Sequence, residues 1–278
     1  MNEQGVQAMA EGVARSDPGA ETSERPVLVD SADGITRLTL NRPAQFNALS
    51  EEMLAALKTA LDDIAADGAV RCVVLAGAGK AFCAGHDLRQ MMAHDGKAYF
   101  KALFEQCSTV MQAIRALPVP VIAQVQGVAT AAGCQLVAAC DLAVAASSAR
   151  LAVSGINLGL FCSTPAVALS RNVAPKAAFD MLFTGRFITA ARALELGLVN
   201  AVAEDDGLEA AVRDYTSAIA AKSAAAVRLG KQMFYAQRAM PLDEAYRFAG
   251  EVMADNMMLA DAQEGIGAFL NKGRPAKP

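Results

Sequence analysis

The stretch "ATAAGCQLVAACDLA" (Ala129–Ala143) decides how this chain is organised. Small residues come first, apolar residues at helical spacing follow, and Asp141 begins the next apolar run. Small residues at a helix N-terminus leave backbone N–H groups accessible, and the helix dipole there favours negative charge. Such a helix start suits an oxyanion hole, although a helix packed tightly on a sheet also demands small residues.

Strands and helices alternate on both sides of this stretch. "VLVD" and "GITRLTLN" flank "SADG" as a hairpin would, and a helix with Ser50 as N-cap runs to Gly68. "RCVVLAG" predicts a buried strand, and the helix in "GKAYFKALFEQCSTVMQAIRAL" stops before Pro118. With "PVIAQVQG" and "DLAVAA" as further strands, the pattern predicts an α/β core with parallel pairing.

Three regions follow from the composition along the chain. Residues 1–25 are poor in large apolar residues and predict a disordered tail, residues 26–202 form the α/β core, and residues 203–278 are helical. The helical region packs on itself, on the core or on a partner subunit.

The composition excludes several classes of protein. Hydrophobic residues make up 54% of the 278, and the net charge is -4, so a large core is expected and nucleic acid is not a partner. No apolar run is long enough to span a membrane, and two histidines make a multi-histidine metal site improbable. Without a secretory signal or a mitochondrial presequence we expect a cytoplasmic protein, with six free buried thiols (Cys72, Cys83, Cys107, Cys134, Cys140, Cys162).

A second motif, "GKAFCAGHDL" (Gly79–Leu88), follows the strand "RCVVLAG". Glycine after a strand lets the backbone approach a ligand closely, so the N–H of His86 could point into a cleft. An ordinary loop leading to a helix capped by Asp87 explains the same residues.

The two motifs together resemble the crotonase superfamily, also called the enoyl-CoA hydratase/isomerase family. The resemblance covers residues 26–278 and includes "LTLNRPAQFNALS", "VVLAGAGKAFCAGHDL", "FTGRFITAARALELGLVN" and "EGIGAFLNKGRP". "GHDL", "AAGCQL" and "NLGLFCSTP" look most like the branch called enoyl-CoA hydratase domain-containing protein 3.

This resemblance implies a spiral of ββα units with a C-terminal helical region that builds a homotrimer, often paired into a hexamer. It implies that an acyl-CoA thioester binds with its carbonyl between the backbone N–H groups of His86 and Ala132. Coenzyme A is then part of the substrate, and no separate cofactor is expected. The activity label would be enoyl-CoA hydratase or isomerase, a lyase or isomerase of fatty-acyl-CoA metabolism.

Contacts to coenzyme A also follow from the resemblance. Ala48, Ala84 and Arg89 match positions along the adenine and pantetheine arm. Phe269 and Lys272 match C-terminal positions that in relatives reach the coenzyme A of a neighbouring subunit, although Lys272 is equally explained as a solvated terminal charge.

Both carboxylates of a hydratase are missing by this comparison. Gln135 stands where one glutamate is expected, and "SGINLG" puts Gly155 at the other. A glutamine amide can hydrogen-bond a water but cannot take its proton at neutral pH, and glycine does neither. General acid–base catalysis contributes about 10²–10⁴-fold, so we expect weak or altered hydratase activity.

Other residues are candidates to replace the missing glutamates. The His86 side chain and Glu105 are possible bases, and Ser163 and Thr164 are possible hydrogen-bond donors to the substrate. Asp141 is expected to have a structural role.

Three hypotheses of function result. The first, which we favour, is an acyl-CoA enzyme that relies on enolate stabilisation. The second is a non-catalytic acyl-CoA binder or regulator, and the third is an RNA-binding relative, which the lack of a basic patch disfavours.

Overall fold

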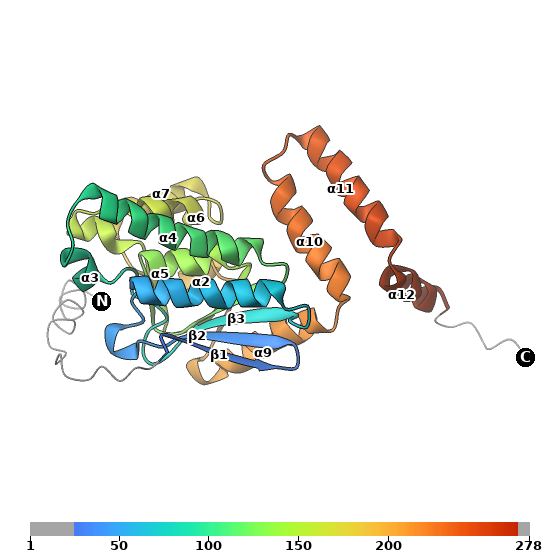
Figure 1. Ribbon diagram of the computed structural model, residues 1–278, viewed down its shortest axis with the longest axis horizontal. Helices are drawn as coiled ribbons and strands as arrows, with labels where there is room; N and C mark the ends of the chain where they lie inside the picture. The colour runs from blue at the N-terminus through green and yellow to red at the C-terminus, as the bar shows by residue number, and fades with distance from the viewer. Residues whose placement is uncertain (1–24, 272–278) are drawn as a thin grey trace, which may run out of the picture.

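The computed structural model describes residues 25–271, which build two sheets and a helical arm (Figure 1). The larger sheet has the order β1-β2-β3-β4-β6-β9. Its strands are β1 (Val27–Ala32), β2 (Ile35–Leu40), β3 (Cys72–Gly77), β4 (Val121–Val125), β6 (Leu142–Ala146) and β9 (Ala201–Ala203). Only β1 and β2 pair antiparallel, so the predicted parallel core is confirmed.

The β1–β2 hairpin turns where the sequence predicted it. Asp33 and Gly34 both have positive φ, 52° and 78°, as a two-residue hairpin turn of the favoured hand requires. Cys72–Gly77 is then buried almost throughout because it pairs on both edges, with β2 and with β4.

Helices cover both faces of this sheet. The longest are α2 (Glu51–Ala66), with the predicted Ser50 cap accepting from the Met53 N–H, and α4 (Lys97–Ala116). In Figure 1 they lie on one side of the sheet, and α9 (Leu208–Ala220) lies on the other. The shorter helices are α3 (Leu88–Met92), α5 (Ala132–Ala139), α6 (Ser163–Leu169), α7 (Pro175–Thr184) and α8 (Ala190–Glu195), with 3-10 turns at Pro43–Gln45, Ser154–Leu158 and Asp205–Gly207.

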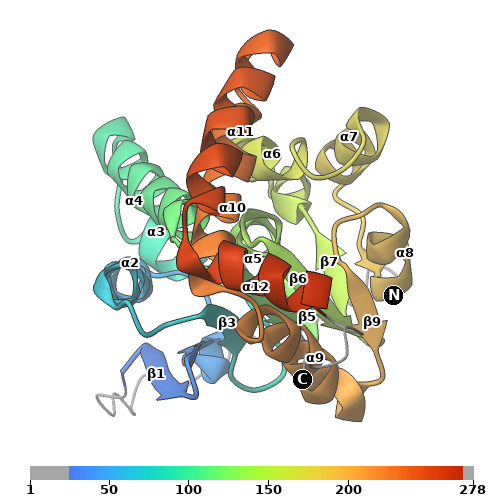
Figure 2. The same cartoon turned by 90° about the vertical axis from the view of Figure 1, so that its right-hand side faces the viewer.

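A smaller sheet, absent from the sequence prediction, holds the start of α5. It consists of β5 (Val128–Thr130), β7 (Arg150–Ala152) and β8 (Ile188–Thr189) in the order β5-β7-β8. Strands of two or three residues leave too short a pattern to recognise in a sequence. Figure 2 shows β5 and β7 beside β6 and β9.

The last helices leave the core as an arm. It comprises α10 (Ala224–Gln237), α11 (Leu242–Met257) and α12 (Ala260–Asn271). Figures 1 and 2 show α11 projecting away from the sheets. Large apolar side chains are exposed along it: Leu242, Tyr246, Met253, Met257, Met258, Ile266, Phe269 and Leu270.

The six cysteines are free and buried, as predicted. Burial raises the pKa of Cys83, Cys107 and Cys134 to about 12, so these thiols are not nucleophiles at neutral pH. Between residues 25 and 271 no cluster of His, Cys, Asp or Glu could hold a metal ion, and no helix is long and apolar enough to cross a membrane. The predicted tail, residues 1–25, lies almost entirely outside the described residues.

Candidate active site

The two motifs singled out in the sequence lie side by side. The Cys83 N–H donates to the Val128 carbonyl at 3.1 Å, and the Thr130 N–H donates to the Cys83 carbonyl at 3.0 Å. Gly133 brings α5 against the same segment, because a Cβ there would lie 2.1 Å from the Cys83 oxygen. The close approach explains why the helix begins with small residues.

Two backbone N–H groups at this junction have no acceptor within the described residues. Leu49 bonds the neighbours of His86, accepting from the Asp87 N–H and donating to the Gly85 carbonyl, so the His86 N–H points away from Leu49. Ala132 opens α5, where N–H groups have no helical partner. A Cβ on Gly85 would lie 3.1 Å from the Ala132 nitrogen, which shows how near the two segments come.

Ala131, the N-cap of α5, holds a strained backbone. Its φ of 51° and ψ of -118° are a conformation that glycine adopts freely and alanine does not. The Ala131 N–H is bonded to the Ala152 carbonyl at 3.0 Å, and this bond to β7 helps to fix the turn that aims the Ala132 N–H.

The His86 side chain turns into the protein. Its ring meets the edge of Phe104 with centroids 5.4 Å apart, and neither ring nitrogen has a hydrogen-bond partner. Burial lowers the pKa of His86 to about 4, so the ring is neutral at neutral pH. The imidazole is not among the side chains that line the cavity described next.

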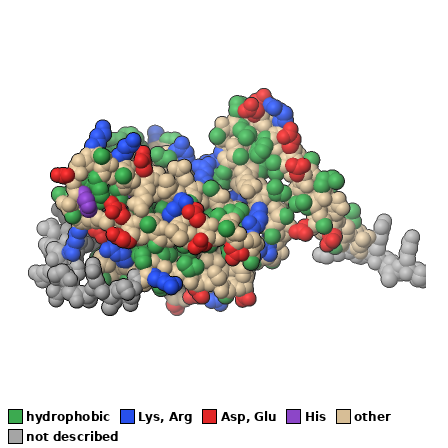
Figure 3. All heavy atoms as spheres, in the orientation of Figure 1, with side chains coloured by type: hydrophobic (Ala, Val, Ile, Leu, Met, Phe, Trp, Pro, Cys, Tyr) green, Lys and Arg blue, Asp and Glu red, His purple; other side chains and the backbone are tan. Residues whose placement is uncertain are grey.

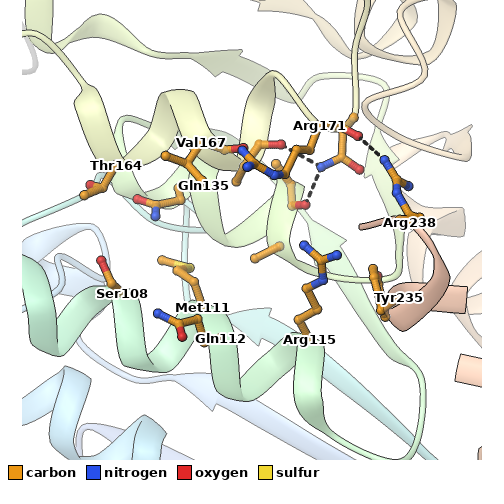
Figure 4. A pocket seen from close by; sticks show the side chains of 14 residues that line it. Ser108, Met111, Gln112, Arg115, Gln135, Thr164, Val167, Arg171, Tyr235 and Arg238 are labelled. Atoms are coloured by element: carbon orange, nitrogen blue, oxygen red, sulfur yellow. Dashed lines mark hydrogen bonds between the residues drawn. The ribbon is translucent and has the colours of Figure 1, made fainter. Parts of the chain in front are cut away.

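A cavity of about 350 Å³ opens beside Gln135, between α4, α5 and α6 (Figure 4). Gln135 is 4% exposed, and its side-chain Oε1 has no hydrogen-bond partner among the described residues. A buried amide oxygen without a donor is costly, so this position favours a ligand or water that donates a hydrogen bond. Thr164 and Ser108 lie at the same end of the cavity (Figure 4).

Gly155 lies apart from that cavity, in the 3-10 turn Ser154–Leu158. A Cβ at Gly155 would lie 2.6 Å from the Leu160 oxygen and 2.7 Å from the Cys162 sulfur. The loop therefore has no room for a side chain at this position in its present conformation.

The candidate contacts on the coenzyme A arm form one surface with the His86 segment. The Ala84 N–H donates to the Phe46 carbonyl at 3.0 Å, which joins the segment to the loop that holds buried Ala48. Arg89 lies in α3, whose N-cap Asp87 pairs with Arg42 at 3.1 Å. The structure brings these positions together, and their contact with coenzyme A stays a prediction.

The remaining candidates lie elsewhere. Ser163 is exposed at the start of α6, and its neighbour Thr164 lines the cavity instead. Glu105 is exposed beside Lys101, 3.7 Å away, and does not reach the cavity. Phe269 is 74% exposed on α12, away from the site of its own chain, and Lys272 lies outside the described residues.

Sequence reasoning missed the far end of the cavity. Arg115 from α4, Arg171 just after α6, and Tyr235 and Arg238 at the end of α10 lie there (Figure 4). These residues are scattered over more than a hundred positions in the chain, and no local motif joins them.

Asp141 explains how α10 reaches the cavity. Its carboxylate accepts from the Lys231 ammonium at 2.7 Å and from the Tyr235 hydroxyl at 2.7 Å, and it also accepts from the Val121 N–H at 2.7 Å. Burial lowers the pKa of Lys231 and raises the pKa of Tyr235. These contacts agree with the structural role inferred for Asp141.

Comparison with known proteins gives a consistent result. The model of the family described as enoyl-CoA hydratase/isomerase matches residues 30–276. Rat enoyl-CoA hydratase domain-containing protein 3, mitochondrial, is 44% identical over 92% of this chain and 86% of its own. A solved enoyl-CoA hydratase from Mycobacterium smegmatis is 57% identical, with a TM-score of 0.89, over 91% of this chain and 98% of its own.

The human enoyl Coenzyme A hydratase domain-containing protein 3 has also been solved. It is 43% identical, with a TM-score of 0.87, over 91% of this chain and all of its own.

The rat protein and its vertebrate counterparts are named as mitochondrial, which contradicts the expected cytoplasmic location. That expectation rested on the lack of a recognisable signal or presequence pattern, which is weak evidence about targeting. With its predicted crotonase fold confirmed, the chain belongs to the enoyl-CoA hydratase/isomerase family and resembles the domain-containing protein 3 branch within it.

Proposed function

We propose that this protein binds acyl-CoA thioesters and polarises the thioester carbonyl between the backbone N–H groups of His86 and Ala132. The observation that carries the proposal is the convergence of these two donors, neither of which has an acceptor in the described chain. Donors aimed at a carbonyl oxygen stabilise the negative charge that develops on it, each contributing about 10²–10³-fold. The family match supports acyl-CoA as the ligand class.

The reaction belongs to the enoyl-CoA hydratase/isomerase class in fatty-acyl-CoA metabolism, with hydratase activity that is weak or altered. Gln135 faces the cavity and has no proton affinity at neutral pH, so it can only orient a water or a hydroxyl. A protein that keeps the oxyanion donors without a proton-moving pair suits chemistry that needs enolate stabilisation alone.

A second candidate function is non-catalytic acyl-CoA binding or regulation. The observation that favours it is the Gly155 loop, which is closed against any side chain by Leu160 and Cys162. The position of the second carboxylate therefore has no space for a glutamate side chain.

Crotonyl-CoA hydration by the purified protein tests the proposal. We expect turnover far below the usual enzymatic median of about 10 s⁻¹. Gln135→Glu restores one proton-moving group and is expected to raise turnover by about tenfold or more. Thr59→Glu, at an exposed position of α2 away from the cavity, adds the same charge; it is the control and is expected to leave turnover unchanged.

Three results would contradict these functions. Wild-type turnover near the median would show that Gln135 and Gly155 do not disable hydration. An unchanged rate in Gln135→Glu would favour the non-catalytic binder. Absence of acyl-CoA binding in calorimetry at millimolar ligand would remove both candidates.

The protein is further proposed to form a homotrimer or a hexamer through its arm. The exposed apolar side chains of α11 and α12, visible in Figure 3 as hydrophobic atoms gathered over the arm, support an interface there. Light scattering should give three or six times the chain mass, and a monomer would contradict the proposal.

A further inference from the structure

The charged side chains that line the cavity beside Gln135 are all cationic, in a protein whose net charge is -4. Its lining includes three arginines, Arg115, Arg171 and Arg238, and no aspartate or glutamate. None of the three forms an ion pair with a carboxylate in residues 25–271. Three guanidinium groups around one hollow repel one another, so their proximity favours an anionic occupant.

Ring and carbonyl contacts, instead of ion pairs, hold the arginines in place. Arg115 lies over the Tyr235 ring, 4.4 Å from its centroid, and Asp141 fixes that ring through the Tyr235 hydroxyl. Arg238 donates to the Arg171 carbonyl at 3.0 Å, and Arg171 donates to the Val167 carbonyl at 2.9 Å. A guanidinium carries five N–H donors, so each keeps donors for a ligand.

The cavity begins at Gln135, one turn of α5 beyond Ala132, and extends to these arginines. Gln135, Ala138 and Ala139 share one face of α5, at helical spacing, and all three line the cavity. With a rise of 1.5 Å per residue, Ala139 lies about 10 Å farther along α5 than Ala132. Met111 and Val167 add apolar wall between the two ends (Figure 4).

We infer that the acyl group of the substrate is of medium length and ends in a carboxylate, which Arg115, Arg171 and Arg238 bind at the far end of the cavity. This rests on the proposed function, because the thioester must lie at His86 and Ala132. The apolar wall accommodates the methylene chain. A chain that ends in a methyl group would need apolar surface at the far end, and three guanidinium groups lie there instead.

Calorimetry with suberoyl-CoA and octanoyl-CoA tests the inference, since the two acyl chains have equal length and differ at the far end. Suberoyl-CoA is expected to bind at least about tenfold more tightly, because hydrogen bonds to a charged group are the strong ones. Equal affinity, or tighter binding of octanoyl-CoA, would overturn the inference and leave the proposed function standing. Failure of both thioesters to bind would overturn the two together.

Variants assign the preference to the arginines. Arg115→Met and Arg238→Met keep the aliphatic stem and should each reduce the preference for suberoyl-CoA by about tenfold. Arg213→Met is the matched control, because Arg213 is exposed on α9 beside Glu209, and it should keep the preference. A preference that survives both cavity variants would overturn the assignment. So would loss of free coenzyme A binding in them, because the arginines would then bind its phosphates.

Discussion

The two ends of the candidate site are built differently. At the proposed thioester end the candidate donors are backbone N–H groups, and small residues set the clearance, with Gly133 packed against Cys83. At the far end long side chains supply the charge, and half-buried Asp141 pairs with buried Lys231 to hold the helix that carries Tyr235. The end built from backbone groups depends on how closely the segments pack, and the end built from side chains depends on which side chains are present. Different substitutions should therefore disable the two ends.

Gly133→Ala should have the largest effect and tests whether the thioester end depends on clearance. Its new Cβ would meet backbone, and separating α5 from Cys83 should cost more than about 4 kcal/mol of unfolding free energy. Gly207→Ala is the control, because a Cβ there meets nothing within 4 Å. Urea denaturation of both variants measures the difference, and equal stabilities would refute the shape argument.

Lys231→Met tests the far end. Removing Lys231 leaves the Asp141 carboxylate with only the neutral donors of Tyr235 and Val121, which should cost about 3–5 kcal/mol. Lys58→Met removes an exposed pair with Asp62 and should cost under about 0.5 kcal/mol. Chemical denaturation gives both values, and hydrogen exchange should localise the Lys231→Met effect to α10. A loss spread evenly over the core would argue against a local anchor.

The loss of folding stability in acid should depend on His86, which belongs to the proposed thioester end. His86 has a pKa of about 4 in the folded chain against an ordinary 6.5, so the unfolded chain binds more protons between those values. Stability should therefore fall as pH drops from about 6.5 to about 4, by on the order of 3 kcal/mol from this residue. His86→Phe should remove that part of the loss, whereas His94→Phe, at an exposed position, should keep it. Unfolding at pH 7 and pH 4.5 provides the comparison, and identical acid losses in the two variants would contradict it.

The smallest expected effect concerns Ala131. Glycine relieves its positive φ but gains freedom in the unfolded chain, so Ala131→Gly should stabilise the protein by about 1 kcal/mol. Ala132→Gly, one residue on and inside the helix, should destabilise it by about as much. Thermal unfolding would show opposite shifts, and shifts of the same sign would mean that Ala131 is not strained.

The contact between the two motifs could be predicted from the sequence because its signals are local. "FCAGHDL" and "ATAAGCQL" each lie within one strand-to-helix connection, and their contact follows from the parallel sheet. The far end could not be predicted, since Arg115, Arg171 and Arg238 come from three helical segments whose meeting depends on how α10 docks. The strands β5, β7 and β8 were missed for a related reason, because their pairing and not their composition makes them strands.

The Asp141 contacts have a consequence for how the chain responds to its ligand. Tyr235 and Arg238 form one wall of the cavity; Tyr235 lies on α10, the first helix of the arm, and Arg238 is the C-cap of that helix. Any molecule that touches that wall favours the docked position of α10, and docking in turn completes the binding cavity. Occupancy of the cavity and the docked position of α10 are thus reciprocally linked, so protection of α10 from hydrogen exchange should report whether the cavity is filled.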